Sequence, residues 1–136
     1  MTARYRPPMV RVVVAEDFAP LRELLELRFS LVDDIAMVGQ AGDGDEAIAL
    51  VEEVAPDILL LHLALPGANG HEVIATVRAR HPEVDIVVLT GAAMVEVRQR
   101  ALDAGATACL LKTPNVIGTV IDTLRAIARR RAEVQR

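Results

Sequence analysis

The segment DILLLHLALPG, residues 57–67, decides the fold. Its apolar run Ile58–Leu61 is short and is soon followed by a Pro-Gly pair, which marks a turn. A short, uninterrupted apolar run of this kind is typical of a parallel strand that is buried on both faces. The run ends at His62, so a polar ring is expected at the carboxyl end of a buried strand.

Four other apolar runs share the length and the β-branched or leucine-rich composition of this one. We therefore predict strands at residues 10–15, 35–41, 58–62, 86–90 and 108–112. Helical periodicity between and after them predicts helices around Leu21 to Leu31, Ala47 to Val54, His71 to Arg80, Ala93 to Ala104 and Ile117 to Ala128. In the first helix, which begins near Pro20, the core-facing residues are expected to be Leu21, Leu24, Leu25 and Leu31. Strands alternating with helices predict an α/β fold, a doubly wound five-stranded parallel sheet with helices on both faces.

Length and composition fit one globular domain. The chain has 136 residues, of which 52% are hydrophobic and 25% charged. We expect a folded domain at residues 10–131, a flexible N-terminal tail at 1–9, and a C-terminal tail or the start of a linker at 132–136. No apolar run is long enough for a membrane span and the N-terminus lacks a signal peptide core, so we expect a cytoplasmic protein without membrane contact. The net charge of -4 argues against direct binding of this domain to DNA.

Polar side chains gather where the predicted strands end. Glu16 and Asp17 follow the first strand, and the third, fourth and fifth strands end at His62, Thr90 and Lys112. The carboxyl ends of parallel strands meet at one edge of a sheet, where doubly wound folds bind their ligands. Carboxylates, a hydroxyl and an ammonium together suit a divalent cation and an anionic oxygen group such as a phosphoryl. Each of these residues alone is equally compatible with an ordinary loop or strand end.

Five stretches in this order resemble the receiver domains of bacterial two-component response regulators, over roughly residues 10–130. They are VVVAEDFAPLR, VGQAGDGDEAI, PDILLLHLALPGANGHEVI, VVLTGA and GATACLLKTP. The resemblance implies a flavodoxin-like sheet with strand order 2-1-3-4-5. It also implies that Glu16 and Asp17 correspond to the pair that holds magnesium, and that Thr90 and Lys112 correspond to the phosphoryl-switch residues. The sequence style is closest to receivers that are joined to helix-turn-helix DNA-binding domains.

Two residues depart from the receiver pattern. His62 occupies the position of the aspartate that accepts the phosphoryl group in a phosphorylated receiver. Asp57 cannot replace it, because it precedes the strand and is expected at the opposite end. Cys109, three residues before Lys112, occupies a switch position where receivers commonly carry tyrosine or phenylalanine. Both departures affect the switch and leave the fold signals intact.

Four explanations of His62 remain open. We favour a degenerate receiver, or pseudo-receiver, in which His62 fills the site, hydrogen-bonds Asp17 and holds one conformation without phosphate. The second is a histidine that accepts the phosphoryl group, and the third is an iron, manganese or zinc site formed by Glu16, Asp17 and His62. The fourth is a substitution introduced in the laboratory. The other histidines, His71 and His81, lie beside turns and are expected to face solvent.

The same replacement lowers the expected affinity for magnesium. A site with an acceptor aspartate gathers three carboxylates and a lysine, about −2 in formal charge, whereas this one carries about −1 when His62 is neutral. Imidazole is also a poor ligand for so hard a cation. We therefore expect weak or absent Mg²⁺ binding at Glu16 and Asp17, no required cofactor, and no catalytic residue.

The predicted function is that of an atypical receiver that acts as a phosphorylation-independent protein-interaction module rather than as an enzyme. By resemblance, its partner, a histidine kinase or a downstream regulator, should bind the face between about Ala93 and Arg130. Met94 and Val95 add apolar surface there, so a weak homodimer through this face is also expected. The alternative is the regulatory half of a helix-turn-helix response regulator, in which case only a separate output domain would contact DNA.

Overall fold

The structure is a computed structural model that describes residues 9–134, along which five strands and five helices alternate. The strands are β1 (Val10–Ala15), β2 (Ile35–Ala41), β3 (Ile58–His62), β4 (Asp85–Thr90) and β5 (Ala108–Leu111). The helices are α1 (Ala19–Ser30), α2 (Gly44–Val54), α3 (Gly70–Arg80), α4 (Val95–Ala104) and α5 (Val116–Val134). All five predicted strands are present, with bounds within one residue of the prediction.

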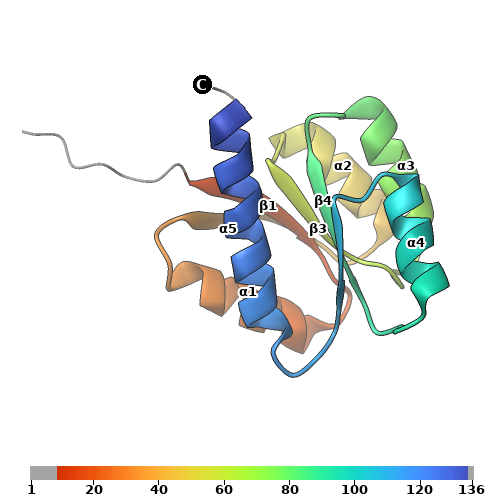
Figure 1. Cartoon of the computed structure of the whole chain (residues 1–136), viewed down its shortest axis with the longest axis horizontal. Coiled ribbons are helices and arrows are strands. Elements are labelled where there is room, and N and C mark those ends of the chain that lie inside the picture. The colour runs from red at the N-terminus through yellow and green to blue at the C-terminus, as the bar shows by residue number, and fades with distance from the viewer. Residues whose placement is uncertain (1–8, 135–136) are drawn as a thin grey trace, which may run out of the picture.

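The strands form one parallel sheet in the order β2-β1-β3-β4-β5, as predicted. Helices α1 and α5 cover one face, and α2, α3 and α4 cover the other (Figure 1). The loops that follow the carboxyl ends of β4 and β5 run along the lower side of the molecule in this view. The polar residues at the strand ends therefore belong to one edge of the sheet.

Alternate residues of each central strand pack into two separate cores. In β1, Val12 and Val14 join the core beneath α1 and α5, whereas Val13 and Ala15 join the core beneath α2, α3 and α4. β3 repeats the pattern, with Leu60 on the first side and Leu59 on the second. Successive side chains of a strand point to opposite faces, so a strand between two helical layers must be apolar throughout. This requirement explains the uninterrupted run that precedes His62.

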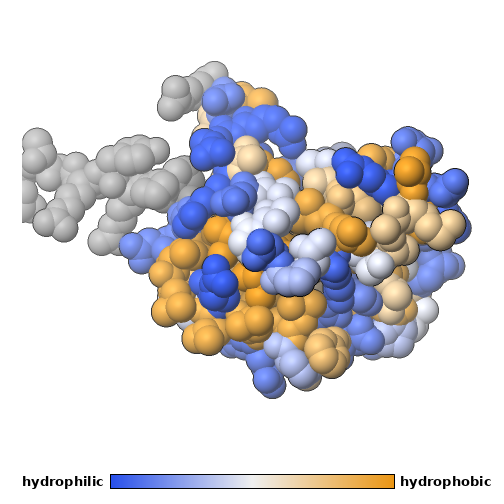
Figure 2. Space-filling model, turned by 60° about the horizontal axis from the view of Figure 1, so that its bottom comes forward, coloured by the Kyte–Doolittle hydropathy of each residue, from blue (hydrophilic) through white to orange (hydrophobic). Residues whose placement is uncertain are grey.

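The predicted core stripe of α1 is wrong at two of its four positions. Leu25 and Phe29 are fully buried and Leu21 packs against them, but Leu24 and Leu31 are 45% and 72% exposed. Residues four apart lie on one face of a helix, so the spacing from Leu21 through Leu25 to Phe29 defines the buried stripe. The remaining leucines belong to a second stripe that faces outward, on the side of the molecule where Figure 2 shows an apolar patch.

The loop that follows His62 is fixed against the first turn of α2. The Gly44 N–H donates to the Pro66 carbonyl oxygen over 3.0 Å. A Cβ atom at Gly44 would overlap the Ala68 carbonyl, so only glycine permits this approach of the loop to the helix. The loop then enters α3, where the Asn69 side chain accepts a hydrogen bond from the Glu72 N–H and caps the helix. The chain on the carboxyl side of His62 is thus held by its neighbours.

Helix α5 continues beyond the expected domain boundary at residue 131. It is helical to Val134, so residues 132–134 extend the helix, while the expected tail residues 1–8 and residues 135–136 lie outside the described part of the chain. Arg125 makes a bidentate pair with Asp34 at 2.8 and 3.1 Å. Arg131 pairs with Asp85 at 2.8 Å.

Within residues 9–134, no helix combines the length and apolar character of a membrane span.

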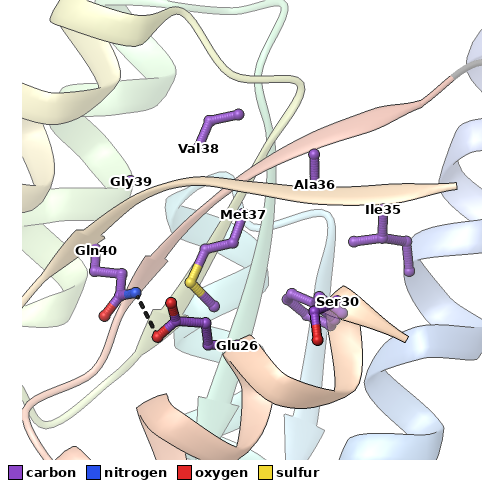
Figure 3. A pocket seen from close by; sticks show the side chains of 9 residues that line it. Glu26, Ser30, Ile35, Ala36, Met37, Val38, Gly39 and Gln40 are labelled. Atoms are coloured by element: carbon purple, nitrogen blue, oxygen red, sulfur yellow. Dashed lines mark hydrogen bonds between the residues drawn. The ribbon is translucent and has the colours of Figure 1, made fainter. Parts of the chain in front are cut away.

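β2 is one edge of the sheet and carries an irregularity. Val12 pairs with Met37 and Val13 with Gly39, which leaves Val38 as an extra residue in β2. A shallow hollow of about 490 Å³ lies along this strand and the end of α1 (Figure 3). The Gln40 side chain crosses it to donate to Glu26 over 3.0 Å.

Candidate functional site

The carboxyl ends of the neighbouring strands β1 and β3 bring the acidic pair and the histidine together. Ala15 and Leu61 are register partners, so the residues that follow them, Glu16 and His62, are adjacent across the two strands. Glu16, Asp17 and His62 can each offer one donor atom such that all three atoms lie within 4.8 Å of one another. Sequence reasoning therefore selected residues that the fold does bring into one cluster.

Glu16 is the buried centre of this cluster, with a side chain only 2% exposed. Lys112, directly after β5, donates from Nζ to Glu16 Oε1 over 2.8 Å. The other oxygen, Oε2, accepts a 3.3 Å hydrogen bond from the Phe18 N–H. A buried carboxylate needs such partners because it has lost its hydration. The single lysine of the chain thus joins the end of β5 to the end of β1.

The imidazole of His62 lies beside both carboxylates without a hydrogen bond to either. Its Nδ1 is 3.6 Å from Glu16 Oε1, and its Nε2 is 3.9 Å from Asp17 Oδ1. Both separations exceed the range of a hydrogen bond, so the predicted His62–Asp17 hydrogen bond is not formed. The Nδ1 atom is buried and has no hydrogen-bond partner among the described residues. The side chain as a whole is 17% exposed.

Burial lowers the pKa of His62 below its ordinary value, since the charged ring loses hydration. Glu16 and Asp17 oppose this effect, whereas the Lys112 ammonium adds to it. The lowered pKa favours the neutral imidazole, which carries a proton on one nitrogen and a lone pair on the other. With a neutral ring, the two carboxylates and the lysine give the cluster a formal charge of about −1.

Two of the three predicted switch positions, Thr90 and Cys109, line a second, smaller hollow beside this cluster, whereas Lys112 does not. Thr90 is buried at the end of β4, and its hydroxyl oxygen accepts a 3.1 Å hydrogen bond from the Ala92 N–H. Cys109 is a free, buried thiol, and burial raises its pKa. The hollow measures about 250 Å³, and Met94, Val95 and residues on β5 also line it. Cys109 behaves here as a small packed side chain.

Asp57 lies at the opposite edge of the sheet, as expected. Its Oδ2 accepts a 2.9 Å hydrogen bond from the Arg11 N–H, and its Oδ1 is 3.5 Å from Arg131. The carboxylate is thus occupied in joining the amino ends of the strands to α5. It cannot serve the cluster at His62.

Two exposed apolar surfaces flank the sheet. The predicted face contains Met94 and Val95, which are 60% and 77% exposed, and Leu111, which is 41% exposed. The outward stripe of α1, which sequence reasoning missed, contains Leu24 and Leu27 and is continued by Leu31, the residue directly after the helix. The i, i+3, i+7 spacing of these leucines indicates a helical stripe of its own. The sequence prediction instead assigned Leu24 and Leu31 to the buried stripe of the helix.

The other two histidines are less exposed than expected. His71 Nδ1 and His81 Nε2 are buried without a hydrogen-bond partner among residues 9–134. His81 lies 3.9 Å from both Glu52 and Glu83, which are 49% and 66% exposed. Neither histidine belongs to the cluster at the strand ends, and His81 serves below as a control position.

Comparison with known proteins identifies what this arrangement is similar to. The family model of the response regulator receiver domain matches residues 12–122. The uncharacterised transcriptional regulatory protein YhcZ of Bacillus subtilis is 37% identical over 103 residues, which are 76% of this chain and 48% of YhcZ. A protein-glutamate methylesterase/protein-glutamine glutaminase of Caulobacter vibrioides is 32% identical over 81% of this chain and 32% of its own length.

A solved structure gives the same result for the fold. The signal receiver domain of the putative response regulator NarL of Mycobacterium tuberculosis superposes with a TM-score of 0.78 and 31% identity. The match covers 88% of this chain and 98% of that domain. By contrast, the chain spans about half the length of the first curated relatives that it matches.

Proposed function

The chain belongs to the response regulator receiver domain family of two-component signalling, and from that premise we propose that it signals without phosphorylation of an aspartate. In this proposal it is a pseudo-receiver, an interaction module and not an enzyme. His62 takes the place of the acceptor carboxylate. One observation carries the proposal: the side chain at the end of β3, beside Glu16 and Asp17, is an imidazole.

The geometry supports the loss of aspartate phosphorylation. The carboxylates near His62 are Glu16, which is buried and bonded to Lys112, and Asp17, which follows β1 rather than β3. The nearest acidic residue along the chain before His62 is Asp57, which is engaged with Arg11 and Arg131. The described part of the chain therefore offers no substitute carboxylate at the end of β3.

The electrostatics support weak magnesium binding. A formal charge of about −1 attracts a divalent cation less than the −2 of a site with three carboxylates. The Lys112 ammonium already occupies Glu16 Oε1 at 2.8 Å. In this proposal the Lys112–Glu16 pair, which needs neither magnesium nor phosphate, holds the carboxyl ends of β1 and β5 in one arrangement.

The proposed partner surface is the face formed by α4, β5 and α5. Met94, Val95 and Leu111 are exposed there, and exposed apolar side chains that gather on one face favour a protein contact. The partner is a histidine kinase or a downstream regulator of a two-component system, and a second copy of the chain is expected to bind the same face weakly.

A second candidate is the regulatory half of a longer DNA-binding regulator. The observation that favours it is that this chain covers 48% of a protein described as a transcriptional regulator. The full length of the gene tests it, because an output domain would follow α5. This candidate concerns what is attached to the domain and leaves the proposal for His62 unchanged.

Acetyl phosphate tests the central claim. The protein is incubated with this donor and Mg²⁺, and its intact mass is measured. We expect no phosphoryl adduct on the parent protein, because the nucleophilic carboxylate is missing. A stoichiometric adduct would contradict the proposal. If that adduct were acid-labile and lost in His62→Ala, the histidine itself would be the acceptor.

A further inference from the structure

We infer that Glu16, Asp17 and His62 form an exchangeable binding site for a divalent transition-metal ion, represented by Zn²⁺, in place of the Mg²⁺ that the family resemblance implies. This inference deepens the proposed function, because it names a ligand for the same pocket. It does not make the metal a requirement for folding or for partner binding.

The spacing of the donor atoms is the first argument. All three side chains offer donor atoms within 4.8 Å of one another, and His62 Nδ1 is 3.6 Å from Glu16 Oε1. Two donors of a tetrahedral zinc ion with bonds of about 2.0–2.2 Å lie about 3.3–3.5 Å apart. The observed separation between His62 and Glu16 is close to this value. Small side-chain movements would bring Asp17 to the same ion.

The unpaired nitrogen of His62 is the second argument. Nδ1 is buried, has no hydrogen-bond partner among the described residues, and lies opposite a carboxylate oxygen. If Nδ1 carries the lone pair, two acceptors face each other; if it carries the proton, 3.6 Å is too long for a hydrogen bond. A cation between the two atoms would satisfy both. A buried polar atom without a partner calls for an explanation. His71 Nδ1 and His81 Nε2 are also unpaired, but among the described residues only Glu16, Asp17 and His62 bring three possible metal donors together.

The chemistry of the donors selects the class of metal. Magnesium prefers oxygen ligands in a near-ideal octahedron, whereas imidazole suits zinc, iron, nickel and copper. A set of one imidazole and two carboxylates is therefore a poor match for Mg²⁺ and a good match for a borderline transition ion. The replacement of one carboxylate by His62 would change the metal preference of the pocket rather than abolish metal binding.

Lys112 explains why the metal should be exchangeable. Its ammonium is 2.8 Å from Glu16 Oε1, one of the oxygens that the ion would use. A bound cation must compete with this ammonium and repels it at short range. The affinity is therefore limited, and occupancy follows the free metal concentration. Binding would also release Lys112, which connects β5 to the loop before α5.

Titration of metal-free protein tests the inference. The full chain is treated with a chelator and titrated with Zn²⁺ or Mg²⁺ alone, with calorimetry to measure affinity and NMR to follow the imidazole signals of its 3 histidines. We expect one Zn²⁺ per chain, bound at least about tenfold more tightly than Mg²⁺. The His62 signals should shift during the Zn²⁺ titration, while those of His71 and His81 should not.

Substitutions assign the binding to the three side chains. His62→Asn and Asp17→Asn should each weaken Zn²⁺ binding by about tenfold or more, since even changes to residues behind metal ligands cost this much. Asp17 is 43% exposed, so Asp17→Asn is expected to fold even if a change at His62 does not. His81→Ala is the matched control, because His81 also lies near two acids and should not contribute.

Three results would overturn the inference: no Zn²⁺ binding, undiminished binding in both His62→Asn and Asp17→Asn, or a preference of the parent protein for Mg²⁺. The failure of the proposed function is a separate outcome. Phosphoryl uptake by the parent protein would refute signalling without phosphorylation, whereas absent Zn²⁺ binding would leave that proposal intact.

Discussion

Replacement of His62 by aspartate should convert the pocket into a magnesium-dependent phosphoryl acceptor. The two neighbouring acids, the buried Thr90 hydroxyl and the Lys112 ammonium all remain at the strand ends. His62→Asp supplies the missing carboxylate at the end of β3. The formal charge of the cluster then changes from about −1 to about −2, which favours a divalent cation.

The expected cost in stability follows from the distances in the pocket. The imidazole nitrogens lie 3.6 Å from Glu16 and 3.9 Å from Asp17. An aspartate can place one oxygen where Nδ1 lies, but it lacks the outer part of the ring, so its charge, shared between two oxygens, lies farther from Asp17. At about 5 Å and an effective dielectric constant near 20, each repulsion is about 3 kcal/mol before screening. The attraction between the new carboxylate and the Lys112 ammonium offsets roughly one of these two repulsions. The repulsion from Asp17 is further weakened by solvent, because the Asp17 side chain is 43% exposed.

The net destabilisation without metal should thus be about 1–2 kcal/mol, or about 3–10 °C in melting temperature for a domain of this size. Magnesium at about twenty times its dissociation constant would return about 1.8 kcal/mol, because it binds only the folded state. Thermal melts of His62→Asp with and without Mg²⁺ measure both effects. Intact-mass analysis after incubation with acetyl phosphate and Mg²⁺ measures phosphoryl uptake.

A matched control separates the site from the substitution. His81→Asp introduces the same side chain near two acids that lie 3.9 Å from the ring, but away from the strand ends. It should neither gain magnesium-dependent stability nor take up phosphate. If His62→Asp behaves like this control in both assays, the pocket is not a receiver site that lacks one residue, and the interpretation of His62 is wrong. A phosphorylated His62→Asp protein whose outer face does not change conformation would still agree with this interpretation, because Cys109 lacks the aromatic ring that receivers commonly carry at that switch position.

Three further changes test other contacts. Lys112→Met should lower the free energy of unfolding, measured by urea denaturation, by about 2–4 kcal/mol, because it leaves the buried Glu16 carboxylate without its cation. A decrease of less than about 1 kcal/mol would refute this account of the Lys112–Glu16 pair. The hydrogen bond from Arg125 lowers the pKa of Asp34 below its ordinary value of 3.8. The Asp34–Arg125 pair therefore stabilises the fold above pH 3.8, and this stabilisation is lost as the pH falls through the lowered pKa of Asp34 in the folded protein. Asp34→Asn should therefore cost about 1 kcal/mol at pH 7 and progressively less in acid, and an equal cost at both would contradict the assignment. Sedimentation at high concentration should detect weak association that Val95→Glu abolishes; a parent protein that stays monomeric, or association that survives the substitution, would exclude that face as the dimer contact.

The fold could be predicted because burial on both faces leaves a strong mark on the sequence. Ile58–Leu61 must be apolar throughout, since alternate residues enter different cores, and the same holds for the β-branched runs of β1 and β4. The strand ends then located Glu16, Asp17, His62 and Lys112 without any structure, because the carboxyl edge of a parallel sheet collects the residues that follow its strands.

Finer features depend on side-chain packing and were beyond such reasoning. α1 carries leucines on two faces, so composition alone could not decide that Leu25 is buried and Leu24 exposed. The predicted hydrogen bond between His62 and Asp17 required a ring orientation that no sequence pattern specifies. The burial of the His62 Nδ1 atom opposite a carboxylate oxygen likewise depends on that ring orientation.

The irregularity in β2 has a consequence for how copies of the molecule can meet. An edge strand offers unpaired peptide groups to any extended chain, and two such edges can join into a continuous intermolecular sheet. In β2 the extra residue at Val38 breaks the regular alternation: Ile35 and Met37 pack toward α1 and α5, whereas Ala41, which an unbroken alternation would place on the same face, packs toward α2. A strand from another molecule that paired with β2 would lose its hydrogen-bond register at this point. The bulge therefore disfavours edge-to-edge aggregation at β2 and leaves β5, the edge strand of the proposed contact face, as the other side of the sheet at which copies of this domain can meet.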